Sequence, residues 1–203
     1  MSLKLKSPSF SRRTFVATAS AITLSAAASN RALAQTSTPV TSVTPDAATS
    51  WTATSPTLPP PLRFTDEQGK SLSLADYKGR LLLVNLWATW CEYCRDELPT
   101  FVALAPKLKA FNGLILPISV DKTGLKAVAP YYKANNITDL PMLADTTGQA
   151  MQMMHTQGIP TTLVVRPDGM SVARMEGSAD WDTPAVLAFL EKLAHAPSQG
   201  TMT

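Results

Sequence analysis

Continuous apolar runs mark the centre of this chain. Residues 81–87 (LLLVNLW) and 114–120 (LILPISV) are almost entirely apolar, as is typical of strands that are covered on both faces of a sheet. A third strand-like run, residues 161–166, leads through Pro-Asp-Gly into residues 170–176. A turn of that composition between two such runs predicts a β-hairpin.

Helical spacing dominates the segment after the first of these strands. Apolar residues recur there every three or four positions (Leu98, Phe101, Val102, Ala105 and Leu108), which predicts a helix beginning near residue 94. Pro99 and Pro106 lie inside this pattern, so we expect one kinked helix rather than two. Residues 148–155 predict a short helix. Thr183 can cap a closing helix that has Pro184 at its first position.

Two further segments complete the predicted architecture. Residues 63–65 and 71–74 flank a turn that contains Gly69, and they predict an N-terminal β-hairpin. A weaker helical pattern follows the second buried strand around residues 125–132. Strand–helix–strand units that lead to a hairpin and a closing helix predict an α/β fold, with a central mixed β-sheet flanked by helices on both faces.

The first 60 residues differ in composition from the rest. Arg12 and Arg13 precede a weakly apolar stretch that ends in Ala-Leu-Ala at residue 34, so residues 1–34 predict a Tat-type signal peptide and export to the periplasm. An Ala/Ser-rich tail with a chance arginine pair is the alternative, and retention as an uncleaved membrane anchor also stays open. Residues 35–60 predict a disordered Thr/Ser/Pro-rich linker, residues 61–196 a folded domain and residues 197–203 a flexible tail.

The net charge of the predicted signal peptide differs from that of the rest of the chain. The first 34 residues hold five of the 18 basic residues and no acidic residue, which leaves 13 basic against 15 acidic residues in the remainder. The basic balance of the whole chain therefore belongs to the signal. Nothing in the mature chain suggests a nucleic-acid footprint, and we expect no nucleic-acid partner.

The two cysteines, Cys91 and Cys94, stand where the first buried strand passes into the predicted helix. A disulfide across two residues would restrain little of the unfolded chain, which favours a reactive over a structural pair. The helix N-terminus stabilises a thiolate, so Cys91 would be the nucleophile and Cys94 the resolving thiol. Zinc would need further ligands, and only His155 and His195 exist, far apart. We therefore predict no metal site.

Two other features admit a chemical and a structural interpretation. Glu97 lies one helical turn after Cys94; it either complements the helix dipole or raises the pKa of the Cys94 thiol and relays its proton. The cluster of Met151, Met153, Met154 and His155 has ligand types that suit Cu(I). The structural interpretation, a helix that fills the core with methionines, is favoured for this cluster.

The segment Trp-Ala-Thr-Trp-Cys-Glu-Tyr-Cys-Arg-Asp-Glu-Leu-Pro at residues 87–99, together with Gly-Ile-Pro-Thr-Thr at residues 158–162, resembles the TlpA/ResA-type branch of the thioredoxin superfamily. The similarity covers about residues 58–195. It implies a thioredoxin-like fold with the added N-terminal hairpin. It also implies a redox-active disulfide between the two cysteines and no other cofactor.

The resemblance assigns roles to individual residues. Cys91 and Cys94 match the nucleophile and the resolving thiol, and Glu97 matches the glutamate that assists the active site. Pro160 matches the family's cis-proline beside the dithiol, and Ile159 would present its backbone to the substrate chain. From the spacing of the sequence alone, an ordinary trans proline would be expected.

Substrate contacts are expected from residues around the pair, namely Trp90, Glu92, Tyr93 and Ile159. Tyr93 departs from the family, which usually has proline there. Tyrosine should relax the turn between the cysteines and add a hydroxyl near the sulfurs, so the reduction potential of relatives is not transferable. Asn85 stands where cytoplasmic thioredoxins have a buried carboxylate.

The function expected from the sequence is that of an exported thiol–disulfide oxidoreductase. It would act as a monomer that reduces client proteins with cysteine pairs, in cytochrome c maturation or copper delivery for oxidase assembly. Its electrons would come from a membrane thiol transporter. A thiol oxidant or isomerase, a Cu(I)-binding chaperone that uses Cys91 and Cys94, and a pure interaction module remain as alternatives.

Overall fold

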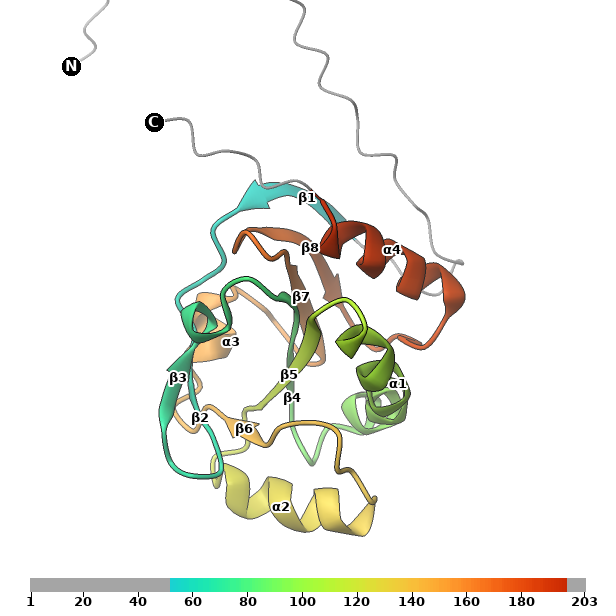
Figure 1. Ribbon diagram of the computed structural model, residues 1–203. Coiled ribbons are helices and arrows are strands. Elements are labelled where there is room, and N and C mark those ends of the chain that lie inside the picture. The colour runs from blue at the N-terminus through green and yellow to red at the C-terminus, as the bar shows by residue number, and fades with distance from the viewer. Residues whose placement is uncertain (1–51, 197–203) are drawn as a thin grey trace, which may run out of the picture. The chain divides into compact units, whose positions relative to one another are not determined.

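The computed structural model describes residues 52–196 (Figure 1). Its strands form one eight-stranded sheet in the order β1-β8-β7-β4-β5-β6-β2-β3. The strands are β1 Thr52–Thr57, β2 Arg63–Thr65, β3 Ser71–Ser73, β4 Leu81–Trp87, β5 Gly113–Ser119, β6 Leu143–Ala144, β7 Thr161–Val165 and β8 Ser171–Glu176. The helices are the 3-10 turn η1 Leu74–Tyr77, α1 Glu92–Lys109, α2 Leu125–Ala134, α3 Gln149–Met153 and α4 Pro184–Ala194.

Strand β4 is the centre of the sheet, as its apolar run predicts. It pairs in parallel with β5 along its whole length and antiparallel with β7. All seven of its residues are buried. Leu81, Leu83 and Trp87 share one core with residues of α1, α2 and α4. Leu82, Val84 and Leu86 share a second core with residues of α3, β2 and β3.

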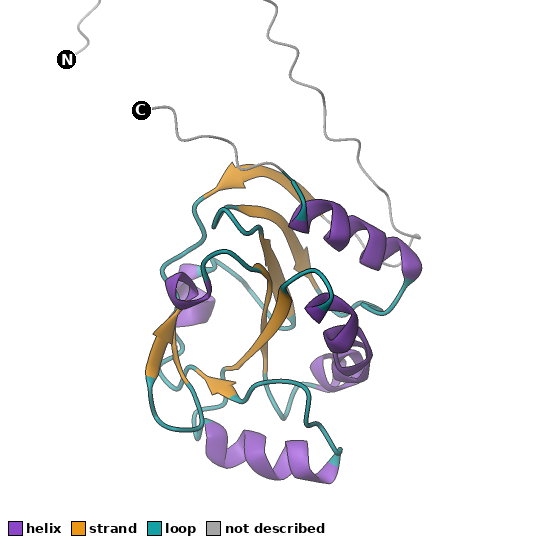
Figure 2. Cartoon of the chain, viewed as in Figure 1, coloured by secondary structure: helices purple, strands orange, loops and turns teal. Residues whose placement is uncertain are grey.

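Helices therefore cover both faces of a mixed sheet (Figure 2), which confirms the predicted fold class. Strands β2 and β3 pair antiparallel at the segments for which the sequence predicts a hairpin. Residue Thr65 of β2 pairs with Ala144 of β6, so this pair continues the sheet beyond β6. Among residues 52–196, none of the helices combines the length and apolar character needed to cross a membrane.

Helix α1 is continuous through Pro99 and Pro106, so the prediction of a single helix is confirmed. It begins at Glu92 rather than near residue 94, because Cys91 has extended backbone angles and serves as its N-cap. Helix α4 begins at Pro184, and the Thr183 hydroxyl accepts a hydrogen bond from the Val186 amide at 3.2 Å. The predicted cap is thus present.

The prediction of a disordered linker is wrong for its last part. Residues 52–57 form strand β1, which pairs antiparallel with β8 and extends the sheet at that edge. An unpaired strand edge offers backbone donors and acceptors, so a Thr-rich segment can add to it without burying apolar side chains. The folded region therefore includes residues before position 61. The predicted signal peptide, residues 35–51 and the C-terminal tail lie outside the described residues.

Candidate active site at the start of helix α1

Strand β4 delivers the cysteine pair to the N-terminus of α1. Cys91 and Cys94 form a disulfide with a Cα–Cα distance of 5.3 Å. The Cys94 amide donates to Cys91 Sγ at 3.2 Å, as a backbone donor does at a helix N-cap. Cys91 is 7% exposed and Cys94 is fully buried. An incoming sulfur can therefore approach Cys91 more readily than Cys94.

A second segment, far away in sequence, closes over Cys91. The Ile159–Pro160 peptide bond is cis, and the Ile159 carbonyl oxygen lies 3.7 Å from Cys91 Sγ. This segment leads into β7, which is the antiparallel neighbour of β4, so the sheet itself places it beside the start of α1. Pro160 is buried while Ile159 remains partly accessible. A peptide backbone that approaches Cys91 would therefore meet Ile159.

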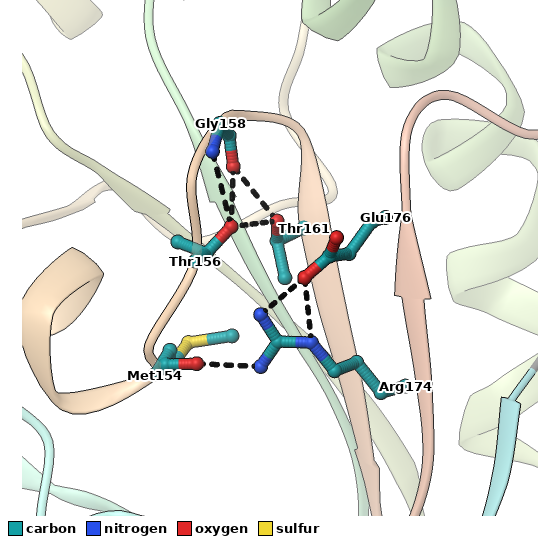
Figure 3. A network of polar contacts seen from close by, with 6 residues as sticks. All are labelled: Met154, Thr156, Gly158, Thr161, Arg174 and Glu176. Carbon is teal, nitrogen blue, oxygen red and sulfur yellow. Dashed lines mark hydrogen bonds and ion pairs between the residues drawn. The ribbon is translucent and has the colours of Figure 1, made fainter.

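Figure 3 shows a polar network that holds the segment before the cis bond. The Thr156 hydroxyl lies 2.7 Å from the Thr161 hydroxyl, and both contact the Gly158 carbonyl, at 2.7 and 2.8 Å. From β8, the Arg174 guanidinium donates to the Met154 carbonyl at 2.6 Å and pairs with Glu176. The segment that carries Ile159 is thus fastened at both ends by side chains of the sheet.

Glu97 lies inside the protein, on the first turns of α1. It is 2% exposed. Its Oε1 accepts from Asn85 Nδ2 at 2.8 Å, and its Oε2 accepts from Trp181 Nε1 at 3.0 Å and from the Ala179 amide at 3.4 Å. Burial raises the pKa of Glu97 to about 7, and the three hydrogen bonds only partly oppose this rise. A carboxyl with such a pKa can both accept and release a proton near neutral pH.

Trp181 and Ala179 are part of this site, although no pattern in the sequence gives them a role there. The Trp181 indole is fully buried and stacks on Phe101 with ring centroids 4.8 Å apart. Its backbone amide also donates to the Thr100 hydroxyl at 3.1 Å. A buried tryptophan needs a partner for its N–H, but nothing in the sequence indicates that this partner is a residue 84 positions earlier.

Asn85 joins Glu97 to strand β7. Its amide nitrogen donates both to Glu97 and, at 3.0 Å, to the Thr162 hydroxyl. Its Oδ1 is buried and has no hydrogen-bond partner among the described residues. The Asn85 side-chain amide therefore links the buried Glu97 carboxylate to strand β7.

A buried carboxylate, Asp121, fixes the loop that precedes the cysteines. Asp121 accepts from the Thr89 amide at 2.9 Å, from the Thr89 hydroxyl at 2.8 Å and from the Ser119 hydroxyl at 2.8 Å. Asp121 follows β5, the parallel neighbour of β4. The parallel pair thus positions the loop between β4 and α1. Nothing in the sequence singles out Asp121, because an aspartate after a buried strand has many ordinary uses.

The outer surface of the site is aromatic. Trp90 and Tyr93 are each 67% exposed, on either side of Cys91 in the chain, and Glu92 between them is exposed as well. Tryptophan and tyrosine are enriched at binding interfaces, because each has a large apolar ring and a polar group. The predicted substrate-contact residues Trp90, Glu92, Tyr93 and Ile159 therefore belong to segments that meet at Cys91.

The methionine cluster packs into the core. Met154 is buried, and Met151 and Met153 pack against the same core as Leu163. His155 is exposed, with a left-handed backbone φ of 49°. Within residues 52–196, no three His, Cys, Asp or Glu side chains are grouped as metal ligands. These positions support the structural interpretation of the methionines.

Comparison with known proteins agrees with this architecture. The AhpC/TSA family pattern matches residues 45–173, which is more than half of the chain. The thiol-disulfide oxidoreductase ResA of Bacillus thuringiensis subsp. konkukian is 30% identical over 113 residues, or 56% of this chain and 64% of that protein. The chain thus spans less than two thirds of the length of this relative.

Several solved structures also resemble the structure of this chain. A thiol:disulfide interchange protein of the thioredoxin family from Chlorobium tepidum TLS matches with a TM-score of 0.56 and 27% identity, over 68% of this chain and 99% of that chain. The exposed lipoprotein thioredoxin Etrx1 of Streptococcus pneumoniae matches with a TM-score of 0.53 and 26% identity, over 66% and 99%. The fold is thioredoxin-like, as the resemblance of the two motifs implies.

Proposed function

The chain belongs to the AhpC/TSA family, and from this premise we propose that it is an exported thiol–disulfide oxidoreductase that reduces disulfides in client proteins. The observation that carries the proposal is the Cys91–Cys94 disulfide at the N-terminus of α1, with the Ile159 carbonyl 3.7 Å from Cys91 Sγ. The ResA relative and the thiol:disulfide interchange protein of Chlorobium tepidum support the reaction class.

In the forward reaction the reduced protein donates two electrons. The Cys91 thiolate attacks one sulfur of the client disulfide; a bond forms between Cys91 Sγ and that sulfur, and the second client sulfur leaves as a thiolate that takes up a proton. Cys94 then attacks Cys91 Sγ and releases the first client thiol. The product is the Cys91–Cys94 disulfide together with a client dithiol, so the sulfur and electron counts balance.

Glu97 supports the second step of this reaction. Cys94 is buried, which disfavours its thiolate, so its attack requires a nearby proton acceptor. Glu97 lies one helical turn after Cys94 and has a pKa raised to about 7 by its burial. It can therefore take the Cys94 proton near neutral pH and return it when the dithiol is regenerated. Asn85, Ala179 and Trp181 position the carboxylate by their hydrogen bonds.

The setting of the reaction is part of the same proposal. The twin arginines of residues 12–13 point to export by the Tat route, and the pneumococcal neighbour is an exposed lipoprotein thioredoxin. A membrane thiol transporter would return electrons to the Cys91–Cys94 disulfide. The clients would be exported proteins with cysteine pairs, in cytochrome c maturation or in copper delivery to oxidases.

The direction of electron flow can be measured. A reductant of this kind needs a potential near the roughly −270 mV of thioredoxin rather than the roughly −120 mV of a strong oxidant. We expect the purified dithiol to equilibrate with glutathione at the reducing end of this range. A potential near the oxidising value would contradict the proposed direction and favour an oxidant.

The clients can be captured through the resolving step. A Cys94→Ser variant can form the mixed disulfide at Cys91 but cannot resolve it, so we expect it to retain periplasmic proteins through disulfides that a reductant releases. Cys91→Ser is the matched control and should retain far fewer. Equal recovery with both variants, or none with Cys94→Ser, would contradict the assignment of Cys91 as the nucleophile.

A further inference from the structure

An apolar groove lies at the opposite end of the sheet from the cysteines. Its volume is about 430 Å³, within the range of roughly 300–1,000 Å³ that small-molecule sites occupy. The groove is walled by the segment between β1 and β2, by η1 and by the ends of β4 and β7. Its apolar lining includes Pro60, Leu62, Leu74, Tyr77, Leu82 and Val165.

Packing and backbone hydrogen bonds hold the walls of the groove in place. Leu62, Leu82 and Val165 are buried and form its floor. The Tyr77 ring stacks on Phe64 with centroids 6.3 Å apart, which joins η1 to β2. The Gly79 amide donates to the Pro167 carbonyl at 3.1 Å and joins the start of β4 to the turn after β7. The groove is therefore preformed, which lowers the conformational cost of binding a ligand.

The charged side chains of the described residues that line the groove are all basic. Arg63, Lys78, Arg80 and Arg166 line it, and no aspartate or glutamate of residues 52–196 does. Arg166 already pairs with Asp168, which lies in the adjacent turn. The Nε of Arg80, in contrast, is buried and has no hydrogen-bond partner among the described residues. Arg80 lines the groove and forms no ion pair with a described residue, so its other N–H groups can donate to an anionic ligand.

The rim is open and apolar. Leu58 lies at the groove and is 81% exposed, the most exposed large hydrophobic side chain of residues 52–196. An exposed apolar residue beside an apolar groove gives a chain-like ligand a continuous surface. A groove lined by both apolar and basic side chains matches an amphiphile with a negative head group.

This site is separate from the dithiol. Arg80 and Leu82 stand around the start of β4, whereas Cys91 follows its end. The seven residues of this strand, at about 3.3 Å each, place the two regions roughly 20 Å apart. A ligand in the groove would therefore contact neither the sulfurs nor Ile159, and its binding does not depend on the proposed function.

We propose that this groove binds a free single-chain carboxylate, a medium-chain fatty acid, with the carboxylate at Arg80 and the alkyl chain along Leu62, Leu82 and Val165. The apolar chain would bury the exposed channel. The carboxylate would accept from the guanidinium in a charge-assisted pair. Lys78 lines the same groove and adds a second positive charge for the carboxylate.

The test is a titration of the full-length protein with decanoate, followed by amide chemical shifts. We expect saturable shifts at groove residues such as Leu82 and Gly169, and none at Cys91 or Ile159. Decyltrimethylammonium, with the same chain and the opposite charge, should bind at least about tenfold more weakly, because one charge-assisted hydrogen bond accounts for about 1.5 kcal/mol or more. Equal binding of both amphiphiles would overturn the assignment of an anionic site.

Variants separate the head-group contact from the channel. Arg80→Gln should weaken decanoate binding at least about tenfold, while Arg80→Lys keeps the charge and should weaken it less. Ala75→Trp fills the groove from its rim and should abolish binding even if Arg80→Gln fails to fold. Lys126→Gln, on the exposed face of α2, is the matched charge control and should bind like the native protein.

The proposal is overturned if decanoate causes no saturable shift, or if Ala75→Trp binds it unchanged. Binding to vesicles of phosphatidylglycerol without binding of free decanoate would also overturn it, because the ligand would then be a membrane surface. Reduction of a disulfide substrate by Ala75→Trp should equal that of the native protein. A loss of that activity together with decanoate binding would contradict the independence of the two sites.

Discussion

The indole Nε1 of Trp181 donates a 3.0 Å hydrogen bond to Oε2 of Glu97, and this bond joins the loop before α4 to the helix that carries the cysteines. Trp181 is held in turn by its stacking on Phe101, which lies one turn further along α1 than Glu97. The indole therefore has little freedom to move away from the carboxylate. Trp181 is a positioning residue for the group that we propose as the proton acceptor.

Replacing Trp181 by phenylalanine should raise the pKa of Glu97 further above about 7. The bond from Trp181 lowers this pKa, so its removal leaves the desolvation less opposed. A hydrogen bond to a charged group contributes about 1.5 kcal/mol or more, which is a roughly tenfold change in the ionisation equilibrium. The measurements are the carboxyl carbon shift of Glu97 and the pH profile of mixed-disulfide resolution, which should both move to higher pH.

Phenylalanine preserves an aromatic ring against Phe101, so the fold should be retained in this variant. Ile137→Val, which alters a partly buried contact of the same core away from Glu97, is the control for packing loss. It should leave the pH profile in place. An unchanged pKa of Glu97 in Trp181→Phe would remove Trp181 from the proposed positioning role.

The stability of the protein should fall as pH rises through the titration of Glu97. Its pKa in the folded protein is about 7, above the ordinary value of 4.5, so the folded state binds the proton more tightly than the unfolded state. The resulting stabilisation is fully present below about pH 4.5 and is lost as pH rises through about 7. The difference corresponds to roughly 3 kcal/mol in the free energy of unfolding.

Urea unfolding between about pH 5 and 8 measures this loss, and Glu97→Gln is the informative variant because it cannot ionise. We expect its free energy of unfolding to vary much less over that interval. Glu191→Gln, at a position exposed on α4, is the matched control and should keep the slope of the native protein. A slope that survives in Glu97→Gln would have to arise from another group.

Removal of the Asp121 carboxylate should destabilise the loop before the cysteines. In Asp121→Ala the Thr89 amide and the hydroxyls of Thr89 and Ser119 lose their acceptor. We expect a loss of about 2–4 kcal/mol in the free energy of unfolding, because buried donors are left unpaired. Asp139→Ala breaks an exposed pair with Lys109 and should cost less than about 1 kcal/mol.

The same variant should also slow the reaction at Cys91, because the loop that presents Cys91 is less well held. Alkylation of the reduced protein by iodoacetamide reports this, at a temperature where both proteins are folded. Alkylation at the native rate in Asp121→Ala would show that the carboxylate supports the fold alone.

Export should depend on the twin arginines. Replacing Arg12 and Arg13 by lysine keeps the charge and removes the feature that the Tat route requires. We expect the double variant to accumulate in the cytoplasm, as measured by cell fractionation and immunoblotting. Lys4→Arg and Lys6→Arg together are the matched control and should be exported normally. Export of the double lysine variant would assign the signal to another route.

The central sheet and the long helix could be predicted because their information is local. An apolar run such as residues 81–87 needs cover on both faces wherever it lies, and the repeat after Cys94 has a helical period whatever it packs against. The reactivity of the cysteine pair follows in the same way from its spacing and its place at a helix start. Even the Thr183 cap could be predicted, because capping involves neighbours in the chain.

Strand β1 could not be predicted, because its formation depends on a partner rather than on its own side chains. Thr52–Thr57 contains no apolar alternation, and it is a strand only because β8 presents an unpaired edge to it. The groove beside Arg80 likewise could not be predicted from the sequence. Its walls come from segments that are far apart along the chain, from Leu58 to Gly169.

The sequence alone predicts the central strands of the sheet, the family resemblance and the reactive cysteine pair, because periodicity and spacing are properties of neighbouring residues. The groups that surround the cysteine pair and Glu97 depend on the tertiary structure. Ile159 reaches Cys91 across 68 positions and Trp181 reaches Glu97 across 84. The raised pKa of Glu97 arises from burial by such distant segments. Burial is a property of the folded chain, so no local pattern could have predicted it.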